Sequence, residues 1–416
     1  MARRAGIFPT FFLSGFECST FIWKDQGRRD LVEETQHRAH ADEDYALLPT
    51  LGMAVAREGV PWPSVDKGGG RFDFACVDVF IAAMNAHKVR PIWDLCHYGY
   101  PDDVDPFAPD FVERFAAYAG AAAEYVSART PGPRFYTPIN EITFFGFMAG
   151  EWGWAAPFGK TREQRHALRL ALARAAIEGV KAILAVDPEA RIVNVDPLIN
   201  VVAPRDRPDL AEAARHETFD DTFFVWDVIC GRQHPEFGGT PETLDIVGAN
   251  VYSFGQLEYR EQGPHASLEP GDDRILPLAD LLVRIHERYG RPMIVAETSG
   301  LEGGREDWLR DVVQEGLAAV NRGVDLHAIC MFPAVDMPDW HTGEWLNNGI
   351  CDLIAQPDGA LKRVPFQPYV DELRRWQREL KRVTVLDEDP FDQPVDLEDV
   401  VEAARRLSPK ADADWH

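Results

Sequence analysis

The stretch that decides the fold is DFACVDVFIAAMNAHKVRPIWDLCH, residues 73–97. Its first part, Asp73–His87, has a helical pattern, and Asp73 is a suitable N-cap residue. Its second part, Arg90–His97, is a short apolar run that ends in polar residues, which is typical of a buried strand in a parallel sheet. A helix followed directly by such a strand predicts one unit of an alternating α/β fold.

The same alternation extends on both sides of this stretch. Further strands are expected at Phe11–Cys18, Met53–Gly59, Phe135–Asn140, Arg191–Asp196, Asp245–Tyr252, Pro292–Glu297 and Leu326–Pro333. Further helices are expected at Ala41–Leu51, Asp110–Arg129 (with Asp110 as its N-cap), Arg162–Val186, Leu210–Cys230, Pro277–Tyr289, Glu306–Arg322 and Gln367–Arg382. Eight strands and eight helices predict a (β/α)8 TIM barrel of the α/β class, with long loops after the fourth, sixth and eighth strands. A doubly wound open sheet is the alternative, but Ser14-Gly15-Phe16-Glu17 is not the glycine-rich turn that it needs.

Composition limits the class of protein. The chain has 416 residues, 45% of them hydrophobic, which is enough for a large core. A net charge of −25 repels phosphate backbones and disfavours a nucleic-acid partner. We expect no membrane span, no signal peptide and free cysteine thiols, which together predict a cytoplasmic protein.

The C-terminal segment differs from the rest. We expect a catalytic barrel over residues 1–383 and an acidic tail over 384–416, which holds ten acidic and three basic residues. Because the tail also contains three prolines, we expect an extended strap with a short helix near Leu397–Leu407, not a second domain.

Several cofactor motifs are absent. Gly159-Lys160-Thr161 hints at a phosphate loop, but Trp154 stands where the loop needs glycine. There is no HExxH or GxSxG, and the histidines show no metal-ligand spacing. We therefore expect no metal and no cofactor.

Polar residues end nearly every expected strand, and barrel active sites lie at these ends. They are Glu17, Arg57, Glu58, Asp94, His97, Asn140, Glu141, Asp196, Asn250, Tyr252, Glu297, Asp336, Asp339 and Trp340. Carboxylates and amides bind hydroxyl groups, and aromatic rings stack on sugar rings, so this set fits a neutral carbohydrate substrate.

Two glutamates close apolar strands. Glu141 follows the fourth strand and Glu297 ends the seventh. Each is a salt-bridged strand end in the simplest interpretation, because a buried carboxylate costs stability unless it is paired or useful. Two of them across one barrel mouth instead predict retaining glycoside hydrolysis, which needs two carboxyl groups about 5–5.5 Å apart.

With these residues in place, the chain resembles the clan A retaining glycosidases, and more narrowly glycoside hydrolase family 1, over about residues 8–355. The motifs that carry the resemblance lie at 40–52, Pro91–Pro101, Thr137–Ile142, Asp245–Tyr252, Ile294–Gly300, Phe332–Trp340 and Asn348–Leu353. The resemblance implies that Glu141 is the acid/base and Glu297 the nucleophile of a β-glycosidase. It further implies substrate binding or carboxylate positioning for Arg57, His97, Asn140, Asn250, Tyr252, Asp339 and Trp340.

The departures from the family pattern include positions that bind the sugar in the family. Ile22 stands where the family has a glutamine that binds the sugar, and Glu17 is the candidate replacement. Asp339 stands for a glutamate, Ile142 for a proline and Thr298-Ser299 for Asn-Gly. The basic cluster of the branch that acts on 6-phospho-sugars is not visible in residues 341–348, which favours an unphosphorylated sugar.

Two alternatives remain open. An endo-acting clan A polysaccharide hydrolase or transglycosidase would use the same two carboxylates in an open cleft. A non-catalytic sugar-binding barrel would retain the scaffold and tolerate the changes at Ile142 and Thr298-Ser299.

Overall fold

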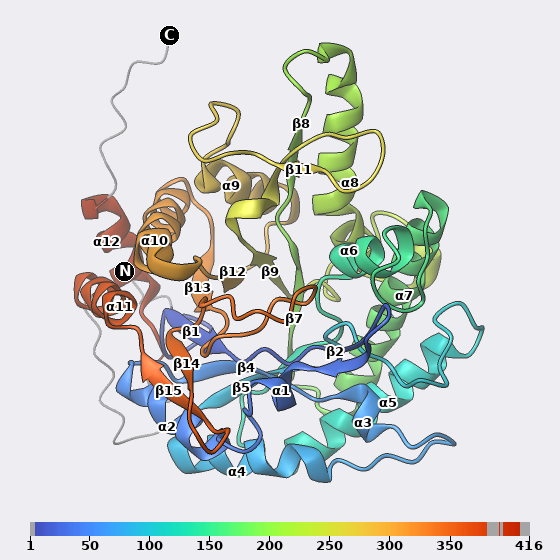
Figure 1. Ribbon diagram of the computed structural model, residues 1–416, viewed down its shortest axis with the longest axis vertical. Helices are drawn as coiled ribbons and strands as arrows, with labels where there is room; N and C mark the ends of the chain where they lie inside the picture. The colour runs from blue at the N-terminus through green and yellow to red at the C-terminus, as the bar shows by residue number, and fades with distance from the viewer. Residues whose placement is uncertain (1–4, 381–390, 392–393, 408–416) are drawn as a thin grey trace.

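Eight parallel strands close into a barrel in the computed structural model, which describes residues 5–380, 391 and 394–407 (Figure 1). Their order around the barrel is β1-β13-β12-β9-β7-β6-β5-β4. The strands are β1 (Phe12–Gly15), β4 (Val55–Gly59), β5 (Arg90–Asp94), β6 (Phe135–Thr137), β7 (Arg191–Pro197), β9 (Ile246–Asn250), β12 (Met293–Thr298) and β13 (Leu326–Met331). All eight expected strands are present, so the predicted TIM barrel is confirmed.

The helices lie between these strands, close to the expected bounds. They are α2 (Ala41–Thr50), α4 (Asp78–His87), α5 (Phe111–Ser127), α7 (Arg162–Val186), α8 (Ala211–Ile229), α9 (Leu278–Tyr289), α10 (Arg305–Asn321) and α11 (Gln367–Glu379). Of the two N-cap predictions, that of Asp73 is wrong and that of Asp110 is right in position. The carboxylate of Asp73 accepts from the backbone N–H of Ala75 at 3.1 Å, and α4 begins only at Asp78, after a 3-10 turn. Asp110 does precede α5, but its side chain makes no capping hydrogen bond.

Every strand contributes at least one apolar side chain to the inside of the barrel, and the first layer takes one from each strand. These are Leu13, Val55, Ile92, Phe135, Val193, Ile246, Ile294 and Ala328, all buried. Phe8, from the segment before β1, stacks against this layer, with its ring centroid 4.8 Å from that of Phe135. The barrel interior is therefore a packed core, and polar side chains are left to the strand ends.

The loops after β6, β9 and β13 are long, as expected. They hold α6 (Ile142–Phe145) with a π-helical turn, β10 (Gln256–Glu258) with β11 (Ala266–Ser267), and the hairpin β14 (Cys351–Ala355)–β15 (Leu361–Pro365). Two further insertions were not predicted: the hairpin β2 (Thr20–Trp23)–β3 (Gly27–Asp30) with α1 (Leu31–Glu34), and β8 (Asn200–Val202), which joins β10 and β11 in a small sheet. A short helix, α3 (Trp62–Val65), follows β4.

The described part of the tail packs on the barrel. Helix α12 (Leu397–Leu407) is present where the sequence predicts it, and it lies beside α10 at the left of Figure 1, where the Nδ2 of Asn321 donates to the Ala404 carbonyl at 2.6 Å. The backbone of Val395 exchanges hydrogen bonds with Gly6 and Phe8. The proposed boundary at residue 383 falls outside the described residues.

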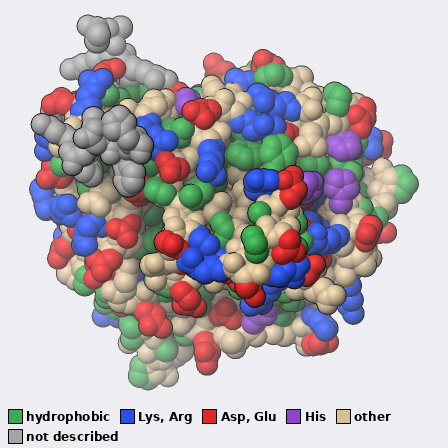
Figure 2. All heavy atoms as spheres, turned by 90° about the horizontal axis from the view of Figure 1, so that it is seen from above, with side chains coloured by type: hydrophobic (Ala, Val, Ile, Leu, Met, Phe, Trp, Pro, Cys, Tyr) green, Lys and Arg blue, Asp and Glu red, His purple; other side chains and the backbone are tan. Residues whose placement is uncertain are grey.

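The surface and the cysteines agree with the composition. Acidic and basic side chains are interspersed over the face drawn in Figure 2, so the net charge is not gathered there into one patch. No helix in the described ranges is long and apolar enough to cross a membrane. The six cysteines are free thiols.

Candidate active site

The two glutamates lie together at the carboxyl ends of the strands. Glu297 is in β12, where its register partner is Asn250 at the end of β9. Glu141 follows β6, and its backbone N–H donates to the carbonyl of Val195 at 3.0 Å. Its φ of +45° is a left-handed conformation that glutamate rarely adopts, so the surrounding structure holds it there at a cost in strain. Both side chains are buried, with Glu141 7% and Glu297 3% exposed.

Glu297 is held by a cation. The Nη1 of Arg57 donates to its Oε1, and the hydroxyl of Tyr252 donates to its Oε2 at 2.9 Å. Burial alone would lower the pKa of Arg57, but the charges of Glu297 and Asp94 outweigh burial and raise it. The guanidinium therefore stays charged, and a permanent positive charge lies beside Glu297.

Glu141 is held by neutral donors only. The Nδ2 of Asn250 donates to its Oε1 at 2.9 Å, and the hydroxyl of Tyr98 donates to its Oε2. Burial, and then the charge of Glu297, raise the pKa of Glu141 to about 7. A carboxyl group with this pKa exchanges its proton near neutrality, which is what a general acid that later acts as a base requires.

The two carboxylates thus have the same number of hydrogen-bond donors, but they differ in the charge of one donor. Each accepts a tyrosine hydroxyl on one oxygen, but the second donor is a guanidinium for Glu297 and an amide for Glu141. The arrangement can keep one carboxylate ionised while the other carries a proton. The predicted contacts of Arg57 and Tyr252 with Glu297 are both present.

Arg57 also fixes the opposite wall of the site. Its Nη2 donates to the Oδ2 of Asp94 at 2.6 Å and to the Oδ1 of Asn140 at 2.7 Å. Because the Asn140 oxygen is used in this way, its Nδ2 points the other way, toward the Nε2 of His97 at 3.2 Å. The Nδ1 of His97 lies 3.1 Å from the Oδ2 of Asp94. Burial alone would lower the pKa of His97, but its neighbours, Asp94 and Glu17 among them, outweigh burial and raise that pKa well above its usual value.

Glu17 lies beside His97, with its Oε1 3.9 Å from the Nε2 of that residue. The backbone N–H of Ser19 donates to the same oxygen at 2.9 Å, and the Glu17 side chain is buried. Ile22, at the family's glutamine position, instead pairs with Arg28 in the β2–β3 hairpin. Glu17 therefore reaches the site and Ile22 belongs to the hairpin next to it.

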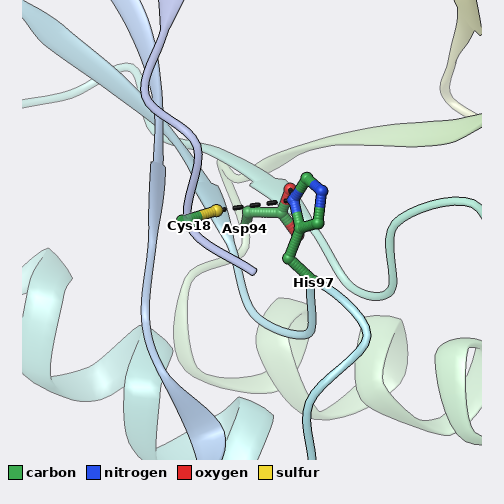
Figure 3. A group of neighbouring side chains, drawn as sticks. All are labelled: Cys18, Asp94 and His97. Atoms are coloured by element: carbon green, nitrogen blue, oxygen red, sulfur yellow. Dashed lines mark hydrogen bonds and ion pairs between the residues drawn. The ribbon is translucent and has the colours of Figure 1, made fainter. Parts of the chain in front are cut away.

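Cys18 and Asp94 both approach the His97 imidazole (Figure 3). The Cys18 Sγ is 3.4 Å from the Nδ1 of His97, and one ligand atom from each of the three residues lies within 4.8 Å of the others. Sequence spacing did not predict this cluster because its members follow two separate strands. Burial raises the pKa of the Cys18 thiol to about 12, and the Arg57 guanidinium already bonds Asp94, so the group resembles a hydrogen-bonded network more than a cation site. The absence of a metal stays a prediction.

Trp340 and Asp339 follow β13. The Trp340 ring packs against Tyr98, with centroids 5.4 Å apart, and so borders the Glu141 side of the site. The Oδ1 of Asp339 instead accepts from the backbone N–H groups of His341 at 2.9 Å and Thr342 at 2.7 Å. Asp339 holds a turn in this structure, and its role in substrate binding stays a prediction.

Two residues with a direct part in the site were not singled out by sequence reasoning. Tyr98 contacts Glu141, and its signal was its place directly after His97 at a strand end. Asp196 was recognised only as a strand-end residue. Its Oδ1 and Oδ2 accept from the N–H and hydroxyl of Thr143, at 3.0 and 2.5 Å, which fixes the start of α6 just after Glu141. Burial raises the pKa of Asp196 to about 8.

Comparisons with known proteins agree with the motif resemblance. No family model matches the chain. In sequence it is similar to the aryl-phospho-β-D-glucosidase BglC of Bacillus subtilis (strain 168), at 23% identity over 423 residues, covering 81% of this chain and 86% of that protein. In fold it is similar to a family 1 β-glucosidase from Thermotoga maritima, with a TM-score of 0.73, 16% identity and coverage of 89% and 97% of the two chains. The AHE enzyme from Alicyclobacillus herbarius is similar to the same degree, with a TM-score of 0.73, 16% identity and coverage of 91% and 100%.

Proposed function

We propose that the protein is a retaining β-glycosidase, with Glu297 as the nucleophile and Glu141 as the acid/base. The observation that carries this proposal is the unequal charge around two matched carboxylates: Arg57 bonds Glu297, and only neutral donors bond Glu141. A retaining mechanism needs one carboxylate that stays ionised and one that cycles its proton. The similarity to named β-glucosidases supports the same class of reaction.

In the first step, the ionised Glu297 attacks the anomeric carbon while Glu141 gives its proton to the departing oxygen. The charge on Glu297 is then lost to a covalent bond, so the pKa of Glu141 falls, because that charge is one of the two causes that raise it. In the second step, Glu141 takes a proton from water, the water oxygen bonds the anomeric carbon, and Glu297 leaves as a carboxylate. Asn140 is the group that we assign to the hydroxyl next to the reacting carbon.

We propose an uncharged sugar in the glycon position. The guanidinium of Arg57 already bonds Glu297, Asp94 and Asn140 through its two Nη atoms. Glu17 adds a further carboxylate beside His97. A phosphorylated sugar would therefore meet net negative charge, in contrast to what the name of the Bacillus subtilis relative says of that protein.

The altered residues next to the glutamates do not favour a non-catalytic barrel. Thr298 turns its hydroxyl away from the site, where it accepts from the Nε1 of Trp308 at 2.8 Å. Ile142 is buried in the core at the start of α6. These departures are used in packing, and the four donors to the two carboxylates are all in place.

A panel of aryl glycosides tests the proposal. It should cover several sugars and both anomers, with the configuration of the first-formed product followed by NMR. We expect hydrolysis of a β-glycoside with retained configuration. Hydrolysis with inversion, or sugar binding without turnover across the panel, would refute the proposal. Product analysis on oligosaccharides of graded length then separates exo from endo action, of which we propose exo.

A further inference from the structure

We infer that Tyr98 is a positioning residue that prepares Glu141 for its work as a base. The inference rests on the proposed function, and it assigns Tyr98 to the second half of the reaction, in which water is activated. The geometry that supports it is the hydrogen bond from the Tyr98 hydroxyl to the Oε2 of Glu141.

Tyr98 is fixed in place by its backbone. Its φ is +66°, so both partners of this hydrogen bond have left-handed backbones that their residue types rarely adopt. The next residue, Gly99, lies so close to the carbonyl oxygen of Thr20 that an added Cβ would stand 1.8 Å from it. Such strain persists only where the surrounding structure over-determines it, and it is common at functional sites.

The side chain of Tyr98 is equally constrained. Its ring packs edge-on against Phe145 with centroids 5.7 Å apart and against Trp340 with centroids 5.4 Å apart. Its oxygen also accepts from the Nδ2 of Asn140 at 3.3 Å. An acceptor bond from the amide leaves the phenol proton for Glu141, so the hydroxyl has one direction in which to donate.

The Tyr98 hydroxyl should stabilise one protonation state of Glu141 more than the other. A hydrogen bond donated to a carboxylate stabilises the ionised form. Burial, and then the charges of Glu141 and Glu297, raise the pKa of Tyr98 well above its usual value, so the phenol keeps its proton across the working pH range. Tyr98 therefore favours ionised Glu141, which is the form that accepts a proton from water.

In that second step, the water O–H bond breaks toward Glu141, the water oxygen bonds the anomeric carbon, and the bond to Glu297 breaks with its electron pair returning to the carboxylate. Tyr98 supplies no proton in this step. It holds the accepting carboxylate in orientation, together with Asn250 on the other oxygen.

Tyr98→Phe tests the inference, with Tyr100→Phe as the matched control. Tyr100 is a buried tyrosine in the same loop, stacked on Phe145, and its hydroxyl has no recorded bond to either glutamate. Kinetics on a 2,4-dinitrophenyl glycoside make the second step limiting, because the leaving group needs no acid. We expect Tyr98→Phe to lower kcat on this substrate about ten- to a hundredfold, as for loss of a hydrogen bond to a charged group, with a parallel fall in KM.

The pH profile provides a second readout. On a phenyl glycoside, whose leaving group does need an acid, the basic limb of kcat/KM should move to higher pH in Tyr98→Phe, because the donor that favoured ionised Glu141 is gone, and it should not move in Tyr100→Phe. Equal loss in kcat and kcat/KM with an unmoved limb would show a merely structural role and overturn the inference. If Tyr98→Phe does not fold, 3,5-difluorotyrosine at position 98, a stronger donor, should move the limb to lower pH, and an unmoved limb again overturns it.

The outcomes separate this inference from the proposed function. A wild-type protein that hydrolyses no β-glycoside refutes both. A wild type that hydrolyses one, with a Tyr98→Phe variant that matches it in kcat, KM and pH profile, refutes only the assignment of Tyr98.

Discussion

The side-chain amide of Asn250 donates to Glu141 at 2.9 Å, although the register partner of Asn250 in the neighbouring strand is Glu297. One residue thus stands beside one carboxylate through the sheet and binds the other through its side chain. Asn250 therefore keeps the two carboxyl groups close to each other. Because they are close, the charge of Glu297 contributes to the raised pKa of Glu141.

The pH dependence of activity follows from that pKa. Because Glu141 must be protonated in the first step and its pKa is about 7, kcat/KM should fall as pH rises through about 7. On a phenyl glycoside, whose leaving group needs an acid, Glu141→Gln should keep only weak activity and should lose this limb. A limb that persists unchanged in Glu141→Gln would show that another residue is the acid.

Arg57 should contribute both to turnover and to the stability of the folded protein. Arg57→Met removes the cation between Glu297 and Asp94, which leaves the buried Glu297 with Tyr252 and the buried Asp94 with His97. We expect a loss of about 3–5 kcal/mol in the free energy of unfolding, together with loss of turnover. Urea denaturation and steady-state kinetics measure the two effects. Full stability with low activity would mean that the carboxylates find other partners or protonate at little cost.

Discrimination against charged sugars tests the role of Glu17. Wild-type protein should hydrolyse an aryl β-glycoside faster than its 6-phospho counterpart, and Glu17→Gln, which removes one negative charge, should narrow the difference. The ratio of kcat/KM for the two substrates, determined for each protein at low and moderate salt, measures this difference. A wild-type preference for the phosphorylated substrate would contradict the proposed glycon.

A buried histidine away from the reacting atoms predicts a pH effect on stability. His37 lies 2.7 Å from Asp44 and 2.9 Å from Glu58, and all three side chains are fully buried. Burial opposes protonation, but the charges of Glu58 and Asp44 outweigh it and raise the pKa of His37 to about 9. The unfolded pKa is lower, about 6.5, so this stabilisation is complete below pH 6.5 and is lost as pH rises through about 9.

His37→Gln checks this sign. The free energy of unfolding of wild type minus that of the variant should be larger at pH 6 than at pH 9.5, measured by urea denaturation. Equal differences at both pH values would show that folding does not raise the pKa of His37.

Much of the fold could be predicted from sequence because buried parallel strands are continuous apolar runs, and nearly every one here ends in polar residues. Glu297 and Glu141 were predicted from that contrast. The β2–β3 hairpin was missed because its strands are four residues long and pack beside the barrel, outside its strand order. Short strands of this kind carry little periodicity.

Several side-chain contacts in the site depend on backbone conformations that cannot be predicted from the amino-acid sequence. Tyr98 contacts Glu141 because both residues are left-handed, and no propensity predicts that for tyrosine or glutamate. Asp339 matches the family position in sequence, yet its carboxylate binds a turn. Motif position pointed to this residue but did not determine its contacts.

Azide rescue of Glu297→Ala tests the central claim most directly. We expect the variant to lose turnover, and azide to restore it by taking the vacated place of the carboxylate, giving a glycosyl azide of inverted anomeric configuration. Glu141→Ala, as the matched control, should give the azide of retained configuration, because Glu297 still forms the covalent intermediate. Near-normal activity in Glu297→Ala, or a product of retained configuration from it, would contradict the assignment of Glu297 as the nucleophile.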